Sequence, residues 1–390
     1  GPAYPLRGGL ATFNHRLAQA FQAQGWQAQL VSFSLQYPSF LFPGKTQYSD
    51  DPAPEGLTIH SWINSINPVN WLQVGHKIRK QKPDLVIVRY WLPFMGPALG
   101  TILRLVKKNK HTRIVCIADN VIPHESRPGD TVFTRYFVKA CDGFLTMSEK
   151  VKSDLASFVT NQPIALSAHP LYDNFGEPID VQTAREHLQL PRSEKLLLFF
   201  GFIRPYKGLD LLLKAMADPR IREAGIKLMI AGEYYEDHKP YDELIHQLNI
   251  EDRLILKTDF IPDSQVRDYL CAADFVIQPY RNATQSGVTP LSMHFELPMI
   301  VTDAGGLKEM VVDKVTGIVV QKDPASISNG ILDYFMKGKE FFIPALIEQK
   351  KSYLEPTQSY LRTNTILYRT NTVILRTNQV ILRINPVILD

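Results

Sequence analysis

Residues 195–216 read KLLLFFGFIRPYKGLDLLLKAM, an apolar run followed by a polar loop and a second apolar stretch. The first run predicts a buried strand that ends at Gly201, and the leucine spacing beyond the loop predicts a helix over 208–217. Arg204 and Lys207 lie in the loop, at the carboxyl end of the strand. A guanidinium fork beside an ammonium charge suits a diphosphate, and the alternative is a pair of solvated loop charges.

The same alternation of buried strand and helix recurs along most of the chain. Further strands are expected at 28–33, 57–62, 84–88, 113–118 and 143–147, and in the second half at 227–232, 254–258, 275–279, 298–302 and 317–320. Such alternation is typical of an α/β protein with parallel sheets and crossover helices. Because 168–194 is polar and turn-rich, we place a domain boundary near Asn174. We predict two Rossmann-like domains, 1–173 and 174–351, facing across a cleft that binds the ligand.

The composition supports two globular domains and excludes other classes. With 390 residues and 45% hydrophobic content, the chain can fill two cores, and its longest apolar run is too short to span a membrane. Residues 1–170 carry a net charge of +8 and residues 171–351 a net charge of −6, which predicts different partners for the halves. Three cysteines without ligand-like spacing indicate a reducing compartment without zinc, and the first residues do not resemble a signal peptide.

Both ends of the chain look unusual. Residues 1–25 read as the loop and helix (10–24) that follow a first strand, so we expect the first domain to lack that strand. From Arg362 the chain repeats a seven-residue unit, RTNTILY, RTNTVIL, RTNQVIL and RINPVIL. Such a repeat fits a helix poorly. We interpret 352–390 as an aberrant tail, the product of a translated tandem repeat or a frameshift, with few contacts to either domain and without function.

Two further loops could hold an anion. Gly8 and Gly9 precede the first helix, where bare backbone and a helix N-terminus favour a negatively charged ligand, although such a pair is often only a turn. The loop before the helix at 287–295 contributes hydroxyl groups and backbone N–H groups. The candidate residues of this loop are Thr284, Gln285, Ser286, Gly287 and Val288.

The first half offers candidates for an acceptor. Asp119 and Asn120 follow the strand at 113–118, and His124 and Glu125 lie a few residues further on. His124 could take a proton from an acceptor hydroxyl or orient it, or could be a structural histidine. In the stretch 89–97, Arg89 and Trp91 follow another strand end, and side chains of this kind suit the face of a sugar or lipid acceptor. The alternative is that they serve only to pack the core. The basic run 103–113 either complements a helix dipole or docks on anionic lipid.

These blocks together resemble the family-4 glycosyltransferases of the GT-B fold. The resemblance rests on 200–216, "MIAGE", "DFIPDSQVRDYLCAADFVIQPY" and "SGVTPLSMHFELPMIVTDAGGLKEMVVDKVTGIVV", and it covers roughly 1–340. It implies that Arg204 and Lys207 bind the donor diphosphate. It also implies that the segment around Ile261 holds the nucleobase through its backbone, and that Gly8 and Gly9 face the leaving group.

One departure from the family pattern concerns its two glutamates, eight positions apart. Those positions are Thr284 and Ser292 here, and neither residue is acidic. We interpret the chain as a member of a subgroup with neutral contacts in an ATQSG loop; reduced activity is the alternative.

The resemblance predicts a retaining glycosyltransferase that moves a sugar from a nucleotide-diphosphate donor to an acceptor hydroxyl of a glycan, a lipid-linked or a small molecule. We expect catalysis by Arg204, Lys207 and His124 without a metal or a cofactor, because the cations would stabilise the leaving diphosphate. We further expect a cytoplasmic protein, possible peripheral contact of the basic half with the membrane, and no nucleic-acid partner. An inactive nucleotide-sugar-binding protein is the alternative. A nicotinamide-dependent oxidoreductase would need a G-x-G-x-x-G motif after a strand, which the sequence lacks.

Overall fold

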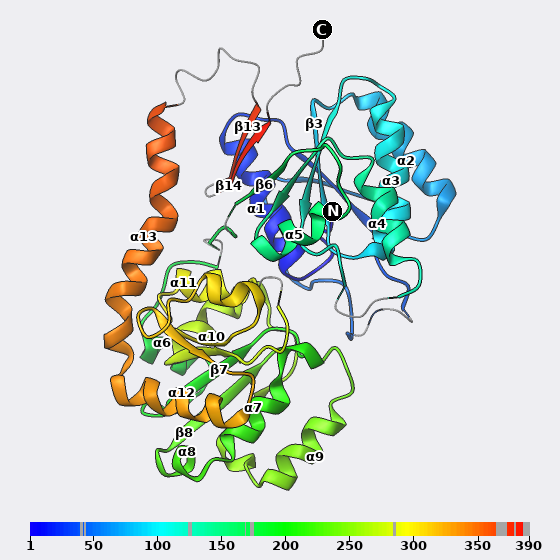
Figure 1. Ribbon diagram of the computed structural model, residues 1–390. Helices are drawn as coiled ribbons and strands as arrows, with labels where there is room; N and C mark the ends of the chain where they lie inside the picture. Colours follow the sequence, from blue (N-terminus) through cyan, green and yellow to red (C-terminus); the bar gives the residue numbers. More distant parts are fainter. Residues whose placement is uncertain are drawn as a thin grey trace. The chain divides into compact units, whose positions relative to one another are not determined.

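The computed structural model (Figure 1) describes residues 1–39, 42, 44–123, 127–167, 169–171, 175–283, 286–363, 373–377 and 380–384. The chain divides into two compact units. Unit 1 comprises Gly1–Phe42, Thr46–Pro170 and Thr357–Asp390, and unit 2 comprises Pro43–Lys45 and Leu171–Pro356. The main division between Pro170 and Leu171 falls close to the sequence-based boundary, which we had placed near Asn174.

Unit 2 is built on a parallel sheet. Its described strands are β7 (Lys195–Phe200), β8 (Ile226–Ala231), β9 (Leu254–Lys257), β10 (Phe275–Gln278), β11 (Met299–Thr302) and β12 (Gly317–Val320). They pair in the order β12-β11-β10-β7-β8-β9, so β7 lies in the middle of the sheet. All the neighbouring strands are parallel. This order is that of a doubly wound fold, in which ligands bind beyond the carboxyl ends of the central strands.

Helices cover both faces of the unit 2 sheet. On β7, Leu197 and Phe199 belong to one core cluster, and Leu196 and Leu198 belong to another. The alternation explains why a fully buried strand reads as a continuous apolar run. The first cluster is completed by α7 (Leu209–Met216), α8 (Pro219–Glu223), α9 (Lys239–Leu248) and α12 (Pro324–Lys337). The second is completed by α6 (Val181–His187), α10 (Val266–Ala272) and α11 (Val288–His294).

Unit 1 contains two parallel sheets. The described strands β3 (Leu85–Tyr90), β4 (Arg113–Ala118), β5 (Gly143–Thr146) and β6 (Ile164–Leu166) pair in that order. Strands β1 (Gln29–Leu35) and β2 (Thr58–Asn64) pair separately. Strand β6 was not expected from the sequence, because its three residues are too few to show a pattern.

Helices also cover both faces of the four-stranded sheet. Along β4, Ile114 and Cys116 face one cluster, and Val115 and Ile117 face the other. The first cluster includes residues of α2 (Pro68–Gln81), α3 (Gly96–Lys107), α4 (Asp130–Val138) and α5 (Glu149–Ala156). The second includes residues of α1 (Gly9–Ala23).

The first residues of the chain run beside β1. The Gly1 ammonium donates to the Val31 carbonyl at 3.0 Å, and the Ala3 N–H donates to the Ser32 hydroxyl at 2.9 Å. We had expected a sheet that lacks its first strand. Within the described residues, no strand pairs β1 with β3, so the sheet of unit 1 is divided at that place.

The C-terminal segment contains a long helix and a hairpin. Helix α13 (Lys339–Thr363) continues without a break across the boundary that we had placed between 351 and 352. Beyond it, β13 (Val373–Thr377) and β14 (Val380–Ile384) pair as an antiparallel hairpin. Strand β13 lies beside α1, as Figure 1 also shows, so the tail has some contact with unit 1, and a tail with few contacts overall stays our prediction.

Candidate functional site

The loop that follows β7 positions the two predicted cations. Residues Pro205–Lys207 form a short 3₁₀ turn, and Gly208 closes it with a φ of 68°. A Cβ atom on Gly208 would lie 2.1 Å from the Pro279 carbonyl oxygen, so only glycine lets this turn approach the end of β10. The turn thereby brings the loop after β7 against the neighbouring strand.

Lys207 is buried in spite of its charge. Its side chain is 8% exposed, and its Nζ atom lies 5.4 Å from the centroid of the Tyr280 ring. Gly201 leaves room for the ammonium, because a Cβ atom there would lie 3.1 Å from Nζ. Burial, and to a smaller extent the positive charge of Arg204, lower the pKa of Lys207 to about 7.

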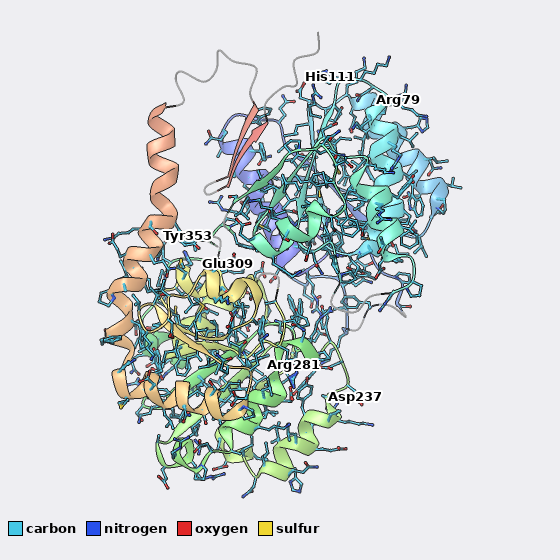
Figure 2. The ribbon with its side chains drawn as sticks, in the orientation of Figure 1. Arg79, His111, Asp237, Arg281, Glu309 and Tyr353 are labelled. Carbon is cyan, nitrogen blue, oxygen red and sulfur yellow. The ribbon has the colours of Figure 1, made fainter. Side chains whose placement is uncertain are left out.

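Arg204 is the second cation of this loop. Its guanidinium lies 4.9 Å from the centroid of the Tyr235 ring, a cation–π contact. Among the described residues, no carboxylate lies within ion-pairing distance of Arg204 or Lys207. The nearby Arg281, labelled in Figure 2, is by contrast paired with Asp210 at 2.6 Å. Two adjacent cations without an acidic partner are arranged to accept an anion.

A hydrogen-bonded relay fixes the loop before α11. Gln278, at the end of β10, donates from Nε2 to the Ser286 hydroxyl at 3.1 Å and accepts from the Thr289 hydroxyl at 3.0 Å. Ser286 also accepts from the Val288 N–H at 3.3 Å. The side chain of Val288 would lie 3.7 Å from a Cβ atom on Gly201, so this loop adjoins the site of Lys207. Sequence reasoning missed Gln278, because a single glutamine at a strand end gives no signal.

The remaining donor-side predictions have different outcomes in the structure. Thr284 and Gln285 lie outside the described residues. Gly287 is the N-cap residue of α11. Ser292 lies within α11, is fully buried, and its hydroxyl has no hydrogen-bond partner among the described residues. Ile261 is half-buried and packs against the core cluster that contains α10.

Aromatic side chains that sequence reasoning missed lie on the same edge of the sheet. The Phe202 and Tyr235 rings stack with centroids 4.1 Å apart, and the Phe202 and Phe260 rings lie 6.3 Å apart at a similar angle. These residues follow β7, β8 and β9, three adjacent strands. The three rings are only partly buried, so they form an apolar surface next to Arg204.

In unit 1, the structure brings together Arg89 and Asp119. The guanidinium donates to both carboxylate oxygens at 2.6 and 2.5 Å, and both side chains are buried. The Arg89 guanidinium also lies 3.7 Å from the centroid of the Phe13 ring. The buried His169 packs edge-on against the same ring, and burial lowers its pKa to about 4. Arg89 and Asp119, which we had predicted to contact an acceptor, therefore pair with each other.

The structure describes four other unit 1 candidates, Trp91, Asn120, Gly8 and Gly9. The Trp91 indole N–H donates to the Tyr37 hydroxyl at 2.6 Å, so it is already used within the fold. Asn120 follows Asp119, and its buried Oδ1 atom has no hydrogen-bond partner among the described residues. Gly8 adopts a φ of 100° as the N-cap of α1, and Gly9 is the first residue of that helix. His124 and Glu125 lie outside the described residues.

Comparisons with known proteins agree with this architecture. Residues 194–336 match the family described as "Glycosyl transferases group 1", and residues 7–166 match "Glycosyltransferase Family 4". Together the two matches span more than three quarters of the chain. Two glycosyltransferase family models thus match the two units of this chain, and each unit is built on parallel sheets.

Several curated relatives share parts of the sequence. The D-inositol 3-phosphate glycosyltransferase of Segniliparus rotundus is 30% identical over 146 residues, which is 37% of this chain and 32% of that protein. The corresponding protein of Xylanimonas cellulosilytica is 28% identical over 61% of this chain and 60% of its own length. The match to the first of these relatives thus spans about a third of that protein's length.

Solved structures share the fold at lower sequence identity. Sucrose-phosphate synthase from Thermosynechococcus elongatus superposes with a TM-score of 0.69, at 15% identity, over 92% of this chain and 94% of that one. HepE of Anabaena, solved in complex with UDP-glucose, gives a TM-score of 0.60 at 16% identity over 80% of this chain and 86% of that one. At these identities the likeness establishes the GT-B fold alone.

Proposed function

We propose that this chain is a glycosyltransferase and that it transfers a sugar from a nucleotide-diphosphate donor to a hydroxyl acceptor with retention of anomeric configuration. The observation that carries the proposal is the pair Arg204 and Lys207, which lies at the carboxyl end of the unit 2 sheet without an acidic partner among the described residues. A diphosphate supplies the negative charge that such a pair needs. HepE of Anabaena, which has been solved in complex with UDP and with UDP-glucose, supports a nucleotide-sugar donor.

The mechanism follows from where charge develops. As the bond from the sugar to the diphosphate breaks, negative charge grows on the departing phosphate oxygens. Arg204 binds a phosphate as a fork, while the buried Lys207 acts as a concentrated charge in a low dielectric. The hydrogen bonds of Gln278 hold Ser286 and Thr289 in place, so this part of the site needs little reorganisation. These groups would do the work that a metal does in other transferases, so metal independence stays our prediction.

Nucleobase and sugar recognition would fall to neutral groups. We assign the nucleobase to the segment around Ile261. Thr284, Gln285, Ser286, Gly287, Val288 and Ser292 remain our candidates for the donor sugar and ribose, without a carboxylate at the family's two acidic positions. Neutral groups of this kind can accept hydrogen bonds from sugar hydroxyls but contribute no charge.

For the acceptor, unit 1 provides a basic domain. Arg89 and Asp119 would act there as a rigid pair that shapes the site, rather than as a free base and a free cation. His124 remains the proposed proton acceptor, with Gly8 and Gly9 toward the leaving group and Trp91 and Asn120 toward the acceptor.

Contact with anionic lipid is a further part of the proposal. Of the basic run at 103–113, Lys107 pairs with Asp142 and Arg104 stacks on Tyr136, whereas Lys108 and Lys110 are exposed. Each exposed cation near an anionic surface contributes about 1 kcal/mol. Across the described residues, no helix has the length and apolar character that a membrane span requires. Co-sedimentation with anionic vesicles, compared with neutral ones, tests this contact, and equal binding to both would contradict it.

The donor assignment is tested by replacing Arg204 with glutamine. We expect transfer from the best nucleotide sugar to fall by roughly 10²- to 10³-fold, as for other groups that stabilise a transition-state oxyanion, while the fold survives. Arg220→Gln is the matched control, because Arg220 pairs with Asp218 on the surface and lies away from the end of β7. Near-normal turnover in Arg204→Gln would remove this site from the mechanism. The anomeric configuration of the product, read by NMR, tests retention separately.

A further inference from the structure

The ring of Tyr280 packs against Lys207, and its buried hydroxyl lacks a well-formed hydrogen bond among the described residues. Tyr280 lies two residues beyond β10 and is 3% exposed. Its hydroxyl makes no hydrogen bond of normal geometry with the described residues. The Ser286 hydroxyl is near enough to interact weakly with it, but Ser286 is already engaged with Gln278 and the Val288 N–H.

Three other buried tyrosines among the described residues use their hydroxyls within the fold. Tyr334 donates to the Asp274 carbonyl at 2.8 Å, Tyr241 donates to Glu236 at 2.5 Å, and Tyr90 is bonded to Thr134 at 3.0 Å. Burying a hydroxyl without a partner costs free energy, so a position that is only structural would favour phenylalanine. Tyr280 therefore differs from these three residues.

The surroundings of Tyr280 point to an anionic ligand. Lys207 Nζ lies over its ring, 5.4 Å from the centroid, and the ring packs edge-on against Tyr206. Its backbone is held by Thr302, whose hydroxyl donates to the Tyr280 carbonyl at 2.5 Å. Burial raises the pKa of Tyr280 well above its usual value, so the phenol stays protonated and can donate at neutral pH.

We propose that the Tyr280 hydroxyl is a donor-binding group that hydrogen-bonds a phosphate oxygen of the nucleotide-diphosphate held beside Lys207. This inference rests on the proposed function, because it assumes a diphosphate at Lys207. It adds a neutral hydrogen-bond donor to the two cations. A phosphate oxygen accepts from a phenol more strongly than a neutral acceptor does.

The test compares Tyr280→Phe, Tyr334→Phe and Lys207→Met in the full chain. Calorimetry measures binding of inorganic pyrophosphate and of whichever of UDP, GDP and ADP binds the unaltered protein most tightly. A lost hydrogen bond to a charged group corresponds to a roughly tenfold or greater rise in Kd. We expect that rise for Tyr280→Phe with both ligands, together with an unchanged or higher Tm. Tyr334→Phe should instead lower Tm and leave Kd unchanged.

The other outcomes separate the two claims. If Lys207→Met weakens binding and Tyr280→Phe does not, the inference is wrong while the proposed function stands. If the unaltered protein binds none of these ligands, or Lys207→Met binds them as tightly, the proposed function fails and the inference with it. If Tyr280→Phe lowers Tm as Tyr334→Phe does, the hydroxyl has a structural partner and the inference is overturned. If Tyr280→Phe binds the nucleotide more weakly but binds pyrophosphate as tightly as the unaltered protein, the hydroxyl does not contact a phosphate oxygen and the inference is wrong.

Discussion

Replacing Lys207 by methionine should stabilise the ligand-free protein, and the gain should depend on pH. Below pH 7 the folded and unfolded chains both carry the lysine charge, so the folded state bears the full cost of burying it. The pKa of Lys207 is about 7 in the folded protein and 10.5 for an ordinary lysine. At about 1.4 kcal/mol per pKa unit, this difference corresponds to a cost of about 5 kcal/mol for burying the charge. At pH values between these two pKa values, Lys207 has lost its proton in the folded protein but keeps it in the unfolded chain, so the free energy of unfolding rises with pH. Above pH 10.5 Lys207 is neutral in both states, so the cost of burying its charge no longer applies.

Urea denaturation at pH 6 and at pH 9 measures this effect. Lys207→Met should exceed the unaltered protein in free energy of unfolding by several kcal/mol at pH 6 and by clearly less at pH 9. Lys227→Met is the matched control, because Lys227 pairs with Glu194 and should show no such gain. An equal difference at both pH values would refute the reasoning, because it would mean that Lys207 does not titrate in this range when folded.

Two further predictions concern the packing of each unit. Gly201→Ala places a Cβ atom 3.1 Å from Lys207 Nζ at a backbone φ of 91°, so we expect a destabilisation of about 1–3 kcal/mol and weaker nucleotide binding. Gly225→Ala, with a φ of 68° and no atom near its Cβ position, is the control for backbone strain alone; equal binding by both variants would contradict the packing argument. Asp119→Asn leaves Arg89 charged and buried, so urea denaturation should show a loss of about 3–5 kcal/mol. Asp84→Asn, at an exposed pair, should cost less than 1 kcal/mol; a similar cost at both positions would contradict the assignment of the Arg89 pair as buried.

Much of the fold could be predicted from the sequence, because its central strands are buried on both faces. The run at 195–200 and the leucines that follow it gave both β7 and α7 to within a residue or two. The position of Arg204 and Lys207 at the strand's carboxyl end followed from the same order of elements. Fold class and the donor-side cations thus depend on local patterns, which a sequence displays.

The features that sequence reasoning missed depend on contacts between distant residues. Arg89 and Asp119 lie on separate strands and are paired only because β3 and β4 are adjacent, so the sequence did not show that they neutralise one another. The hydrogen bonds of Gln278 and the unpartnered Tyr280 hydroxyl could not be predicted either, because they depend on the packing of the end of β10 against the turn at Gly208. At the C-terminal end, the repeat begins at Arg362, and the sequence did not indicate that α13 continues to Thr363.

The central claim is that Lys207 and its neighbours bind the donor's diphosphate, and proton uptake on binding tests it most directly. Calorimetric titration with the best nucleoside diphosphate at pH 8, in two buffers of different ionisation enthalpy, gives the number of protons taken up. The free ligand is fully ionised at this pH, because its last phosphate pKa is about 6. We predict uptake of close to one proton by the unaltered protein, because the anion raises the lysine's pKa from about 7, and almost none by Lys207→Met. Equal affinity and equal uptake in the two proteins would contradict the account.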